Sequence, residues 1–490
     1  MEKSINYFSR VLCALLLCAG MVMTSCEETN PVDDNKTELG GENTSGEEDK
    51  CPATLTLDKV TATTATFTGH LDVAASDLSF SQVTVYYSDA ETFNMNAAES
   101  VSATSFDKDQ NFTITLTNLK YGTKYNYCMV AEVKSEKTYG DVLDFTTTDV
   151  TFSDLSSSTS ANCYIVSEPG FYKFKTVKGN SSESVGNVAS ASILWETFGT
   201  DTAPELLELI GEFFYKDGYI VFQTADTFRE GNAVIAAKDA DGNILWSWHI
   251  WLTDQPQGQV YYNGAGTMMD RNLGATSATP GDVGALGLLY QWGRKDPFLS
   301  AGSISSSAVA ESTITWPSAV SSDSSNGTIA YATANPTTFI KYNSNNYDWH
   351  YTGSSSIDNT RWTTSESSKS IYDPCPSGWR VPDGGSNGIW SNALGSSSIF
   401  VGYPYDSTNE GMNFSRKFGA DQIIWYPTSG YREGLDGGLD TVGSSGRYWS
   451  ASPDDDCASY LYFNYNGFVS PSDSDGRAHG LSVRCLQESK

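Results

Sequence analysis

The chain has 490 residues, which suggests about three domains of ordinary size. Asp and Glu number 59 against 30 Lys and Arg, so the formal net charge of −29 argues against a nucleic-acid partner, which needs a basic face. The hydrophobic fraction of 39% excludes global disorder, while a charged fraction of only 18% and many Gly and aromatic residues favour β-rich extracellular modules over a helical cytosolic enzyme.

The first 26 residues predict export and a lipid anchor. Lys3 and Arg10 precede an apolar run at 11–23, which has the length of a signal-peptide core and is too short to span a membrane comfortably. The sequence Met-Thr-Ser-Cys at 23–26 resembles a bacterial lipobox, so Cys26 is the predicted lipidation site. An ordinary secretory signal with an incidental cysteine is the alternative.

Residues 27–50 are predicted to form a disordered acidic tether, because they hold few apolar side chains and carry net negative charge. The acidic residues directly after Cys26 resemble the surface-export signal of Bacteroides-type lipoproteins. The alternative is a solvated tether that carries no export signal. No later stretch reaches about 18 consecutive apolar residues, so the predicted location is the outer membrane, at the cell surface, with the lipid as the only anchor.

Six cysteines follow the signal peptide and Cys26. They form no Cys-x-x-Cys pair, and the four histidines of the chain lie far apart in sequence, so a zinc site is not expected. Spacing alone does not fix how they pair. The six are Cys51, Cys128, Cys163, Cys375, Cys457 and Cys485.

The segment 51–148 alternates between apolar and polar residues as strands do. Strands are predicted at 65–71, 82–87 and 112–116, with polar turns between them, which indicates a sandwich. The sequence Leu-Lys-Tyr-Gly-Thr-Lys-Tyr-Asn-Tyr at 119–127 resembles the fibronectin type III signature around the tyrosine corner. The resemblance implies a domain that acts mainly as a spacer.

The segment 149–254 is predicted to be a second β-sandwich module. Strands are expected at 218–222, 232–237 and 244–252, the last one after an Asp-Gly-Asn turn. A short amphipathic helix is expected over 204–214.

The strand at 244–252 has one face with Trp246 and Trp248 and an opposite face with Ser247 and His249. Tryptophans on one face of a strand could form a sugar platform, but period-two apolar spacing is the usual signature of a core. We expect Trp246 and Trp248 to be buried and His249 to be a structural histidine with its hydrogen bonds satisfied.

Residues 255–490 differ in composition from the two preceding modules. They contain Ser-rich stretches at 302–327 and 353–370, which are typical of long surface loops. Several short motifs lie between and around these loops. In this order they resemble the Fibrobacter major paralogous domain family, which is related to C-type-lectin-like and sulfatase-modifying-factor-like folds. The motifs are Met-Asp-Arg-Asn-Leu-Gly-Ala at 269–275, Leu-Tyr-Gln-Trp-Gly-Arg at 289–294, Asp-Pro-Cys-Pro-Ser-Gly-Trp-Arg-Val-Pro at 373–382, Arg-Tyr-Trp-Ser-Ala-Ser at 447–452 and Leu-Ser-Val-Arg-Cys at 481–485.

The resemblance implies an irregular α+β domain in which the N- and C-terminal strands meet, with helices at 284–294 and 387–394. It also implies a disulfide between Cys375 and Cys485, because their motifs lie on adjoining strands in the family and the compartment is oxidising. The predicted fold class is therefore mainly β and multidomain: two β-sandwich modules followed by an irregular α+β C-type-lectin-like domain. Core roles are expected for Trp379, Trp449 and Arg484.

Calcium-dependent sugar binding is the first of three hypotheses for the last module. The Glu-Pro-Asn, Gln-Pro-Asp and Trp-Asn-Asp sequences of true C-type lectins are absent, but two acidic clusters have enough oxygen ligands for Ca²⁺. Simple solvation of these clusters is the alternative, and no other cofactor is expected. The candidate ligands are Asp454, Asp455, Asp456, Asp473 and Asp475.

Oxidative chemistry, as in formylglycine-generating enzymes, is the second hypothesis and needs two reactive cysteines. Only Cys457 is left once the terminal-strand cysteines pair, and no Gly-x-Ser-x-Gly, His-Glu-x-x-His or phosphate-loop motif occurs. We therefore predict no catalytic residue and no enzymatic activity, although paired carboxylates distant in sequence are an alternative.

Non-catalytic recognition by loop aromatics is the third hypothesis, because flat rings stack on sugars or proteins while polar neighbours reach the hydroxyls. Some of these aromatics must be core residues, and the sequence does not sort them. The predicted ligand-binding residues are Trp349, Trp362, Trp425 and Tyr431, within a larger set that adds Tyr347, Tyr351, Trp390, Tyr403, Tyr405, Tyr426 and Tyr448.

The predicted protein is thus a surface lipoprotein whose C-terminal domain, 255–490, binds an extracellular glycan or a partner protein without turning it over. A structural or tip subunit of a surface fimbria, assembled with other fimbrial subunits by strand exchange, is the alternative. A glycan-modifying enzyme is the third possibility.

Overall fold

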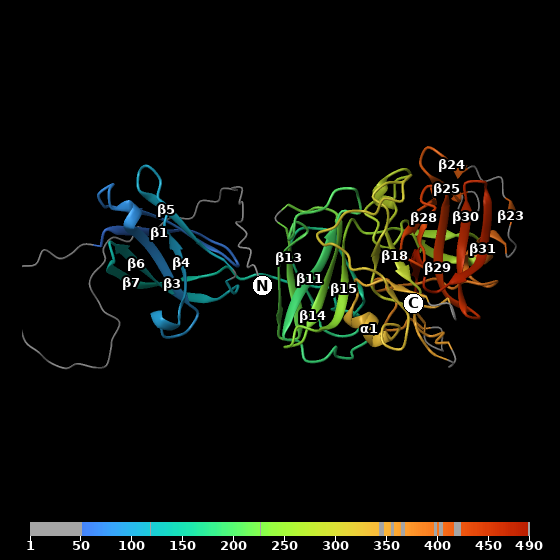
Figure 1. Cartoon of the computed structure of the whole chain (residues 1–490), viewed down its shortest axis with the longest axis horizontal. Helices are drawn as coiled ribbons and strands as arrows, with labels where there is room; N and C mark the ends of the chain where they lie inside the picture. The colour runs from blue at the N-terminus through green and yellow to red at the C-terminus, as the bar shows by residue number, and fades with distance from the viewer. Residues whose placement is uncertain are drawn as a thin grey trace, which may run out of the picture. The chain divides into compact units, whose positions relative to one another are not determined.

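The computed structural model describes two compact units that divide between Thr151 and Phe152 (Figure 1). Strands are the predominant regular structure of both units, and two short α-helices occur among the described residues, so the prediction of a mainly β, multidomain chain is confirmed. Cys26, the signal peptide and the tether lie outside the residues that the structure describes. The described residues are 51–117, 119–225, 227–342, 347–353, 357–363, 368–395, 399–400 (backbone only), 405–415 and 423–488.

The first unit is a sandwich of two antiparallel sheets with strand orders β1-β2-β5 and β4-β3-β6-β7. Alternate residues of β5 are buried, as the sequence pattern predicts. The backbone N–H of Lys120 donates to the hydroxyl of Tyr125 at 2.8 Å, which confirms the tyrosine contact expected at this corner. The strands are β1 Ala53–Val60, β2 Ala65–Leu71, β3 Ser81–Ser88, β4 Glu99–Ala103, β5 Asn111–Leu116, β6 Lys124–Val133 and β7 Glu136–Thr146, with short 3₁₀ helices at η1 Leu78–Phe80 and η2 Met95–Ala97.

The second unit begins with two more four-stranded sheets, of orders β12-β13-β10-β8 and β11-β14-β15-β9. Trp246 and Trp248 of β15 are buried in the core between these sheets, as predicted. The strands are β8 Ser153–Asp154, β9 Cys163–Val166, β10 Phe171–Lys175, β11 Ser190–Thr197, β12 Ile210–Lys216, β13 Tyr219–Thr224, β14 Gly231–Lys238 and β15 Ile244–Leu252.

The opposite face of β15 is buried as well, because it packs on the following part of the chain. Ser247 donates to Asp296 at 2.6 Å, and the indole N–H of Trp251 donates to the carbonyl of Ala275 at 3.0 Å. His249 is a buried structural histidine, as predicted: its Nε2 donates to Asn232 Oδ1 at 2.8 Å, and burial lowers its pKa to about 3. Its Nδ1 makes no hydrogen bond with the described residues, so its hydrogen bonds are only half satisfied. Residues on both sides of position 254 therefore share one core.

The rest of the second unit holds one large sheet, β19-β18-β32-β29-β30-β31-β23 with β27 and β28 beside it, and several small ones. Strand β17 pairs with β33, so the terminal strands of this region meet as expected. Trp449 and Arg484 are buried, as predicted, whereas Trp379 is half-buried. The elements are β16 Gly258–Tyr261, η3 Tyr262–Gly264, β17 Gly266–Met269, η4 Val283–Ala285, β18 Leu288–Gln291, β19 Phe298–Leu299, β20 Val320–Ser321, α1 Ile329–Ala334, β21 Ile340–Lys341, β22 Trp379–Arg380, α2 Ile389–Leu394, β23 Ile399–Phe400, β24 Tyr405–Asp406, β25 Gly411–Asn413, β26 Trp425–Pro427, β27 Tyr431–Arg432, β28 Leu439–Asp440, β29 Ser445–Asp454, β30 Cys457–Asn464, β31 Phe468–Gly476, β32 Gly480–Ser482 and β33 Leu486–Gln487.

Two of the three expected helices are wrong. The segment 204–214 ends in strand β12, whose aromatic residues pair with β13 in antiparallel register, so sheet pairing overrides the helical spacing of its leucines. The segment 284–294 contains strand β18, and Gly287 with φ of 71° interrupts any helix there. The helix expected at 387–394 is present as α2. No helix among the described residues has the length and apolarity that a bilayer span requires.

Candidate functional site

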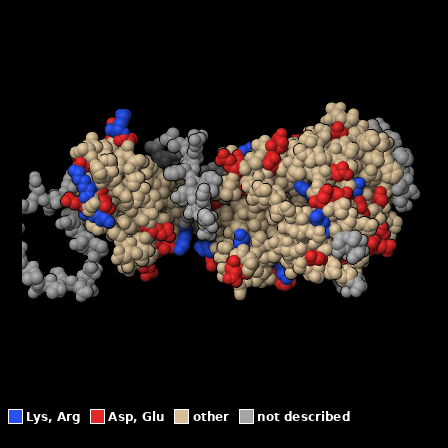
Figure 2. Space-filling view, in the orientation of Figure 1, with Lys and Arg blue, Asp and Glu red and all other residues tan. Residues whose placement is uncertain are grey.

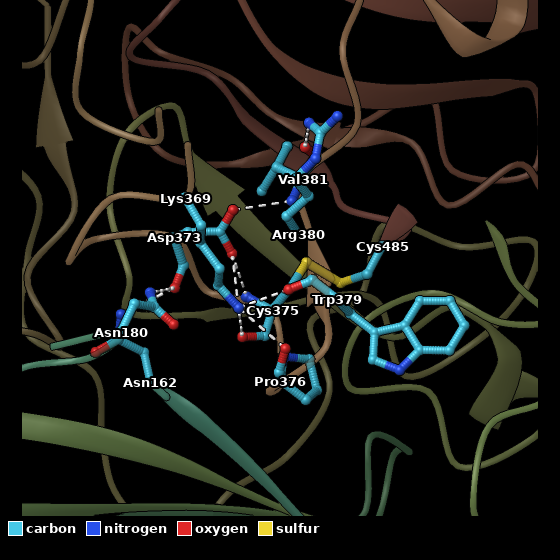
Figure 3. The surroundings of a disulfide bond; sticks show 10 residues. All are labelled: Asn162, Asn180, Lys369, Asp373, Cys375, Pro376, Trp379, Arg380, Val381 and Cys485. Carbon is cyan, nitrogen blue, oxygen red and sulfur yellow. Dashed lines mark hydrogen bonds and ion pairs between the residues drawn. A yellow bond between two sulfur atoms is a disulfide. The ribbon is translucent and has the colours of Figure 1, made fainter. Parts of the chain in front are cut away.

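The predicted disulfide between Cys375 and Cys485 is present and lies within a dense set of buried hydrogen bonds (Figure 3). The ammonium group of Lys369 donates to the carbonyls of Cys375 at 2.7 Å, Pro376 at 2.9 Å and Trp379 at 2.6 Å. All three N–H donors of this lysine are therefore used to hold the loop that carries the disulfide.

Asp373 fixes the same loop from its other end. Its carboxylate accepts hydrogen bonds from the backbone N–H groups of Cys375 and Val381, both at 2.9 Å. The side-chain amide of Asn162, from the first half of the unit, donates to the carbonyl of Asp373 at 2.9 Å. The motif at 373–382 is thus a structural framework that joins the two halves of the second unit.

The thiols of Cys128, Cys163 and Cys457 are free. Burial is the largest cause that raises the pKa of each; for Cys128 and Cys457 it raises the pKa to about 11. A thiol with a raised pKa is a poor nucleophile near neutral pH. These side chains therefore offer no activated thiolate for chemistry.

The structure places the three predicted ligand-binding tryptophans in the interior, which corrects their expected role. Trp349, Trp362 and Trp425 are at most 3% exposed. The indole N–H of Trp349 donates to the carbonyl of Trp292 at 2.8 Å, and that of Trp362 donates to the carbonyl of Arg294 at 3.0 Å. Rings enclosed in this way have no free face on which a sugar could stack.

Three of the six other described loop aromatics are also buried: Trp390, Tyr426 and Tyr448 line the core on one side of the large sheet. Tyr351 and Tyr405 are partly buried, and Tyr347 has 55% of its surface exposed. Tyr403 lies outside the described residues.

The acidic residues proposed for calcium fall into two places. Asp454, Asp455 and Asp456 lie at the hairpin between β29 and β30, and Asp473 and Asp475 lie on β31. Among the described residues, no group of three or more Asp, Glu, His and Cys side chains is arranged to hold a metal ion. Asp475 is instead engaged with protein cations, as described next.

Tyr431 and Asp475 meet around Arg447, in a group that we call the Arg447 cluster: Tyr431, Arg447, Tyr462, Asp475 and His479. The guanidinium carbon of Arg447 lies 3.8 Å from the ring centroid of Tyr431 and 5.6 Å from that of Tyr462. Its Nη1 donates to Asp475 Oδ2 at 2.7 Å. Strand pairing sets this geometry, because Arg447 of β29 lies directly opposite Tyr462 of β30.

His479 and the nearby carboxylates set the electrostatics of the cluster. His479 Nδ1 accepts a hydrogen bond from the backbone N–H of Gly434 at 2.9 Å, so the proton on Nε2 points to Asp475 Oδ1 at 3.2 Å. Burial is the largest single influence and opposes ionisation of Asp475, but the hydrogen bond and charge of His479, the backbone N–H of Gly476 and the charge of Arg447 together outweigh it, so the pKa of Asp475 is lowered. Burial, assisted by the charge of Asp475, raises the pKa of Asp473.

The cluster is partly open to solvent, although the predicted ligand-binding residue Tyr431 is itself buried, with 6% of its surface exposed and Arg447 stacked on its ring. The Arg447 side chain is 16% exposed and that of Asp475 is 27% exposed. The Nε atom of Arg447 is buried and makes no hydrogen bond with the described residues. Figure 2 shows acidic side chains, with a few basic ones among them, over the region that carries β28–β31 in Figure 1.

Such an arrangement can bind a ligand that both donates and accepts hydrogen bonds. A planar guanidinium donates, neighbouring carboxylates accept, and the partly buried Tyr462 ring offers apolar surface. Sequence reasoning named Tyr431, Asp473 and Asp475 but not Arg447 or His479. The signal for Arg447 was available, since it stands in the motif at 447–452, but its pairing with residues of β27 and β31 is visible only in three dimensions.

No family profile matches this chain, and no curated protein matches it. Segments of solved structures do match: two are sensor domains of the anti-sigma factor RsgI4 in Pseudobacteroides cellulosolvens, one in a short form and one in solution. The first is 19% identical with a TM-score of 0.16 and covers 20% of this chain and 97% of its own. The second is 20% identical with a TM-score of 0.15 and covers 19% of this chain and 70% of its own. Similarity at this level does not identify a function.

Proposed function

We propose that the Arg447 cluster binds a neutral extracellular glycan without turning it over. The observation that carries the proposal is the position of the partly exposed Arg447 guanidinium, whose central carbon lies 3.8 Å from the ring centroid of Tyr431 and whose Nη1 donates to Asp475 at 2.7 Å. Stacked aromatic, cationic and anionic groups on one partly open face are the components of a shallow sugar site.

The charge balance favours a neutral ligand over an acidic one. Asp475 accepts a hydrogen bond from Arg447, the charge of Asp473 also interacts with Arg447, and the Tyr431 hydroxyl donates to Glu433 at 2.9 Å. An anionic ligand would be attracted by one guanidinium but repelled by several carboxylates, whereas an uncharged hydroxyl would not be repelled. A sugar hydroxyl can accept from Arg447 and donate to a carboxylate at once.

We further propose that the protein is a lipoprotein anchored in the outer membrane through Cys26, with fibronectin type III-like and C-type-lectin-like modules beyond the tether. The lipobox-like sequence at 23–26 and the two-sheet sandwich with its Tyr125 contact support this. Cys26→Ala should release the protein from the membrane fraction. Unchanged membrane retention would contradict the anchor but leave the glycan proposal standing.

The test of glycan binding uses the full chain on an array of neutral and acidic glycans. We expect weak binding to a neutral glycan, with Kd between about 10 μM and 1 mM, because shallow sites bury little surface. Arg447→Met should weaken it at least tenfold. Arg229→Met, which removes a half-exposed arginine with a carboxylate partner elsewhere in the unit, is the matched control and should bind normally.

Three outcomes would contradict the proposal. These are binding by Arg447→Met equal to that of the unmodified chain, preference for an acidic ligand, and detection by mass spectrometry of product formed from the bound glycan. Polymerisation, or co-purification with pilins, would favour the alternative role as a fimbrial subunit.

A further inference from the structure

We propose that the second unit has a second binding site, distinct from the Arg447 cluster, which takes a short, uncharged and hydroxyl-rich oligosaccharide. The site is a cavity of about 590 Å³ between the segment 156–182 and the segment 368–378, with Glu488 at its border. Its volume falls within the range of about 300–1,000 Å³ that is typical of small-molecule sites. The proposal does not depend on ligand binding at the Arg447 cluster.

The chemistry of the wall favours a ligand that is rich in hydroxyls. Eight of the fourteen lining residues are Ser or Thr, and Val177 is the aliphatic exception among them. A hydroxyl can donate and accept, so it complements another hydroxyl better than it complements a purely anionic or cationic group. The side chains of Ser158 and Ser182 are exposed and make no hydrogen bond with the described residues, which leaves them available to a ligand.

The charges of the cavity balance, which argues against an ionic ligand. Lys369 reaches the wall, but its ammonium group donates to three backbone carbonyls and its charge is offset by the Asp373 carboxylate at 3.6 Å. That leaves Lys175 and Glu488, one of each sign, as charged groups that a ligand could meet. A strongly charged ligand would be attracted to one of them and repelled by the other.

The wall is held in place before any ligand arrives. The side-chain amide of Asn180 donates to the carbonyl of Ser370 at 2.6 Å, and the hydroxyls of Thr159 and Ser377 are hydrogen-bonded across the junction. Figure 3 shows Asn180 and Lys369 beside the loop that the disulfide anchors. A preformed wall reduces the entropy lost on binding, which matters most for a weak polar ligand.

The experiment isolates the cavity by using full-length Arg447→Met, so that the first site is disabled, on an array of neutral and acidic glycans. We expect retained binding to at least one neutral oligosaccharide. Adding Ser158→Leu and Ser182→Leu should weaken it at least tenfold, because two apolar side chains then occupy the cavity mouth. Ser157→Leu, an exposed neighbour outside the lining, is the matched control and should change binding less than twofold.

Two further variants keep the result interpretable. Ser182→Asn adds bulk but stays polar, so it should weaken binding while the unfolding midpoint is unchanged, which separates occlusion from misfolding. Lys175→Met should change binding less than threefold if the ligand is neutral.

The proposal is overturned if Arg447→Met binds no neutral glycan, if the serine variants bind as the control does, or if Lys175→Met abolishes binding, which would indicate an acidic ligand. If the serine variants abolish binding while Arg447→Met has no effect, the cavity is supported and the Arg447 proposal fails.

Discussion

Strand β5 of the first unit and strand β15 of the second show two ways in which a strand buries its side chains. In β5 the residues alternate between exposed and buried along its whole length. In β15 every residue from Trp246 to Leu252 is buried, including Ser247 and His249. The polar residues of β15 face a second part of the chain rather than water, so a polar position in a strand can mark an internal interface as well as a surface.

The ion pairs of the two units also differ in how deeply they are buried. In the first unit Lys108 and Asp109 are paired with side chains 87% and 64% exposed. In the second, Lys295 and Asp296 lie 2.6 Å apart with side chains 2% and 7% exposed. Exposed pairs contribute little, while a buried charge that loses its partner is costly. The two units should therefore respond very differently to equivalent substitutions.

The largest difference should come from the disulfide. Replacing Cys375 and Cys485 by Ala removes a cross-link between residues 110 apart and should destabilise the second unit by about 4–5 kcal/mol in the chain-entropy model, with no change in the first. Urea unfolding of the full chain, followed by tryptophan fluorescence and circular dichroism, measures both units. Cys457→Ala, at a free and partly exposed thiol, is the control and should cost less than about 1 kcal/mol. An unshifted second transition in the double variant would contradict the prediction.

Removing one partner of the buried pair should have the next largest effect. Asp296→Ala leaves Lys295 buried with Ser247 as its remaining partner, and we expect a loss of about 3–5 kcal/mol. The equivalent change in the first unit, Asp109→Ala, should stay within about 0.5 kcal/mol. Equal losses in the two units by urea unfolding would refute the contrast between them.

Glu196 predicts a pH dependence confined to the second unit. Its carboxyl is fully buried, and burial raises its pKa to about 7, although it accepts backbone hydrogen bonds from Leu207 and Ile210. A raised folded pKa gives stability that is complete below the unfolded pKa and lost as pH rises through about 7. Between about pH 4 and pH 8 the free energy of unfolding should therefore fall by about 2–3 kcal/mol through this group.

Glu196→Gln is the variant that checks this pH dependence. The amide cannot ionise, so the difference in unfolding free energy between this variant and the unmodified chain should change with pH over that window. A difference that stays constant from pH 4 to pH 8 would show that the carboxyl does not titrate as the structure indicates.

The smallest effect belongs to the first unit. Tyr125→Phe removes the acceptor for the backbone N–H of Lys120 and should cost about 1 kcal/mol, since a typical hydrogen bond contributes about that much. Tyr139→Phe, whose hydroxyl makes no hydrogen bond with the described residues, is the control. A first-unit midpoint that shifts equally in both variants would argue against a role for the tyrosine contact.

The sequence predicted the parts of the fold that depend on local pattern. Period-two spacing located β2, β5 and β15, and the tyrosine pattern located the Tyr125 contact, because both are properties of a single strand or corner. The prediction of a helix at 204–214 was wrong, because the hydrogen-bonded pairing of β12 with β13 overrides the helical spacing of the leucines.

The candidate site was harder to predict because its members come from separate strands. Tyr431 and Asp475 were singled out separately, while Arg447, which joins them, was assigned only to a motif. Loop aromatics such as Trp349 could not be sorted, because irregular segments have no periodicity that distinguishes an inward ring from an outward one. Burial by distant segments decided their position.

The shared face of β15 limits how this protein can be rearranged by evolution or by design. The amide oxygen of Asn232 accepts a hydrogen bond from His249, and its amide nitrogen donates to the carbonyl of Gly274 at 2.9 Å, so hydrogen bonds connect the segments before and after position 254. If residues 255–490 were exchanged for an unrelated module, Trp251 would become exposed and the side chain of Asn232 would lose its hydrogen-bond partner at Gly274. Residues 152–254 and the segment that follows should therefore be inherited, transplanted and expressed as one piece.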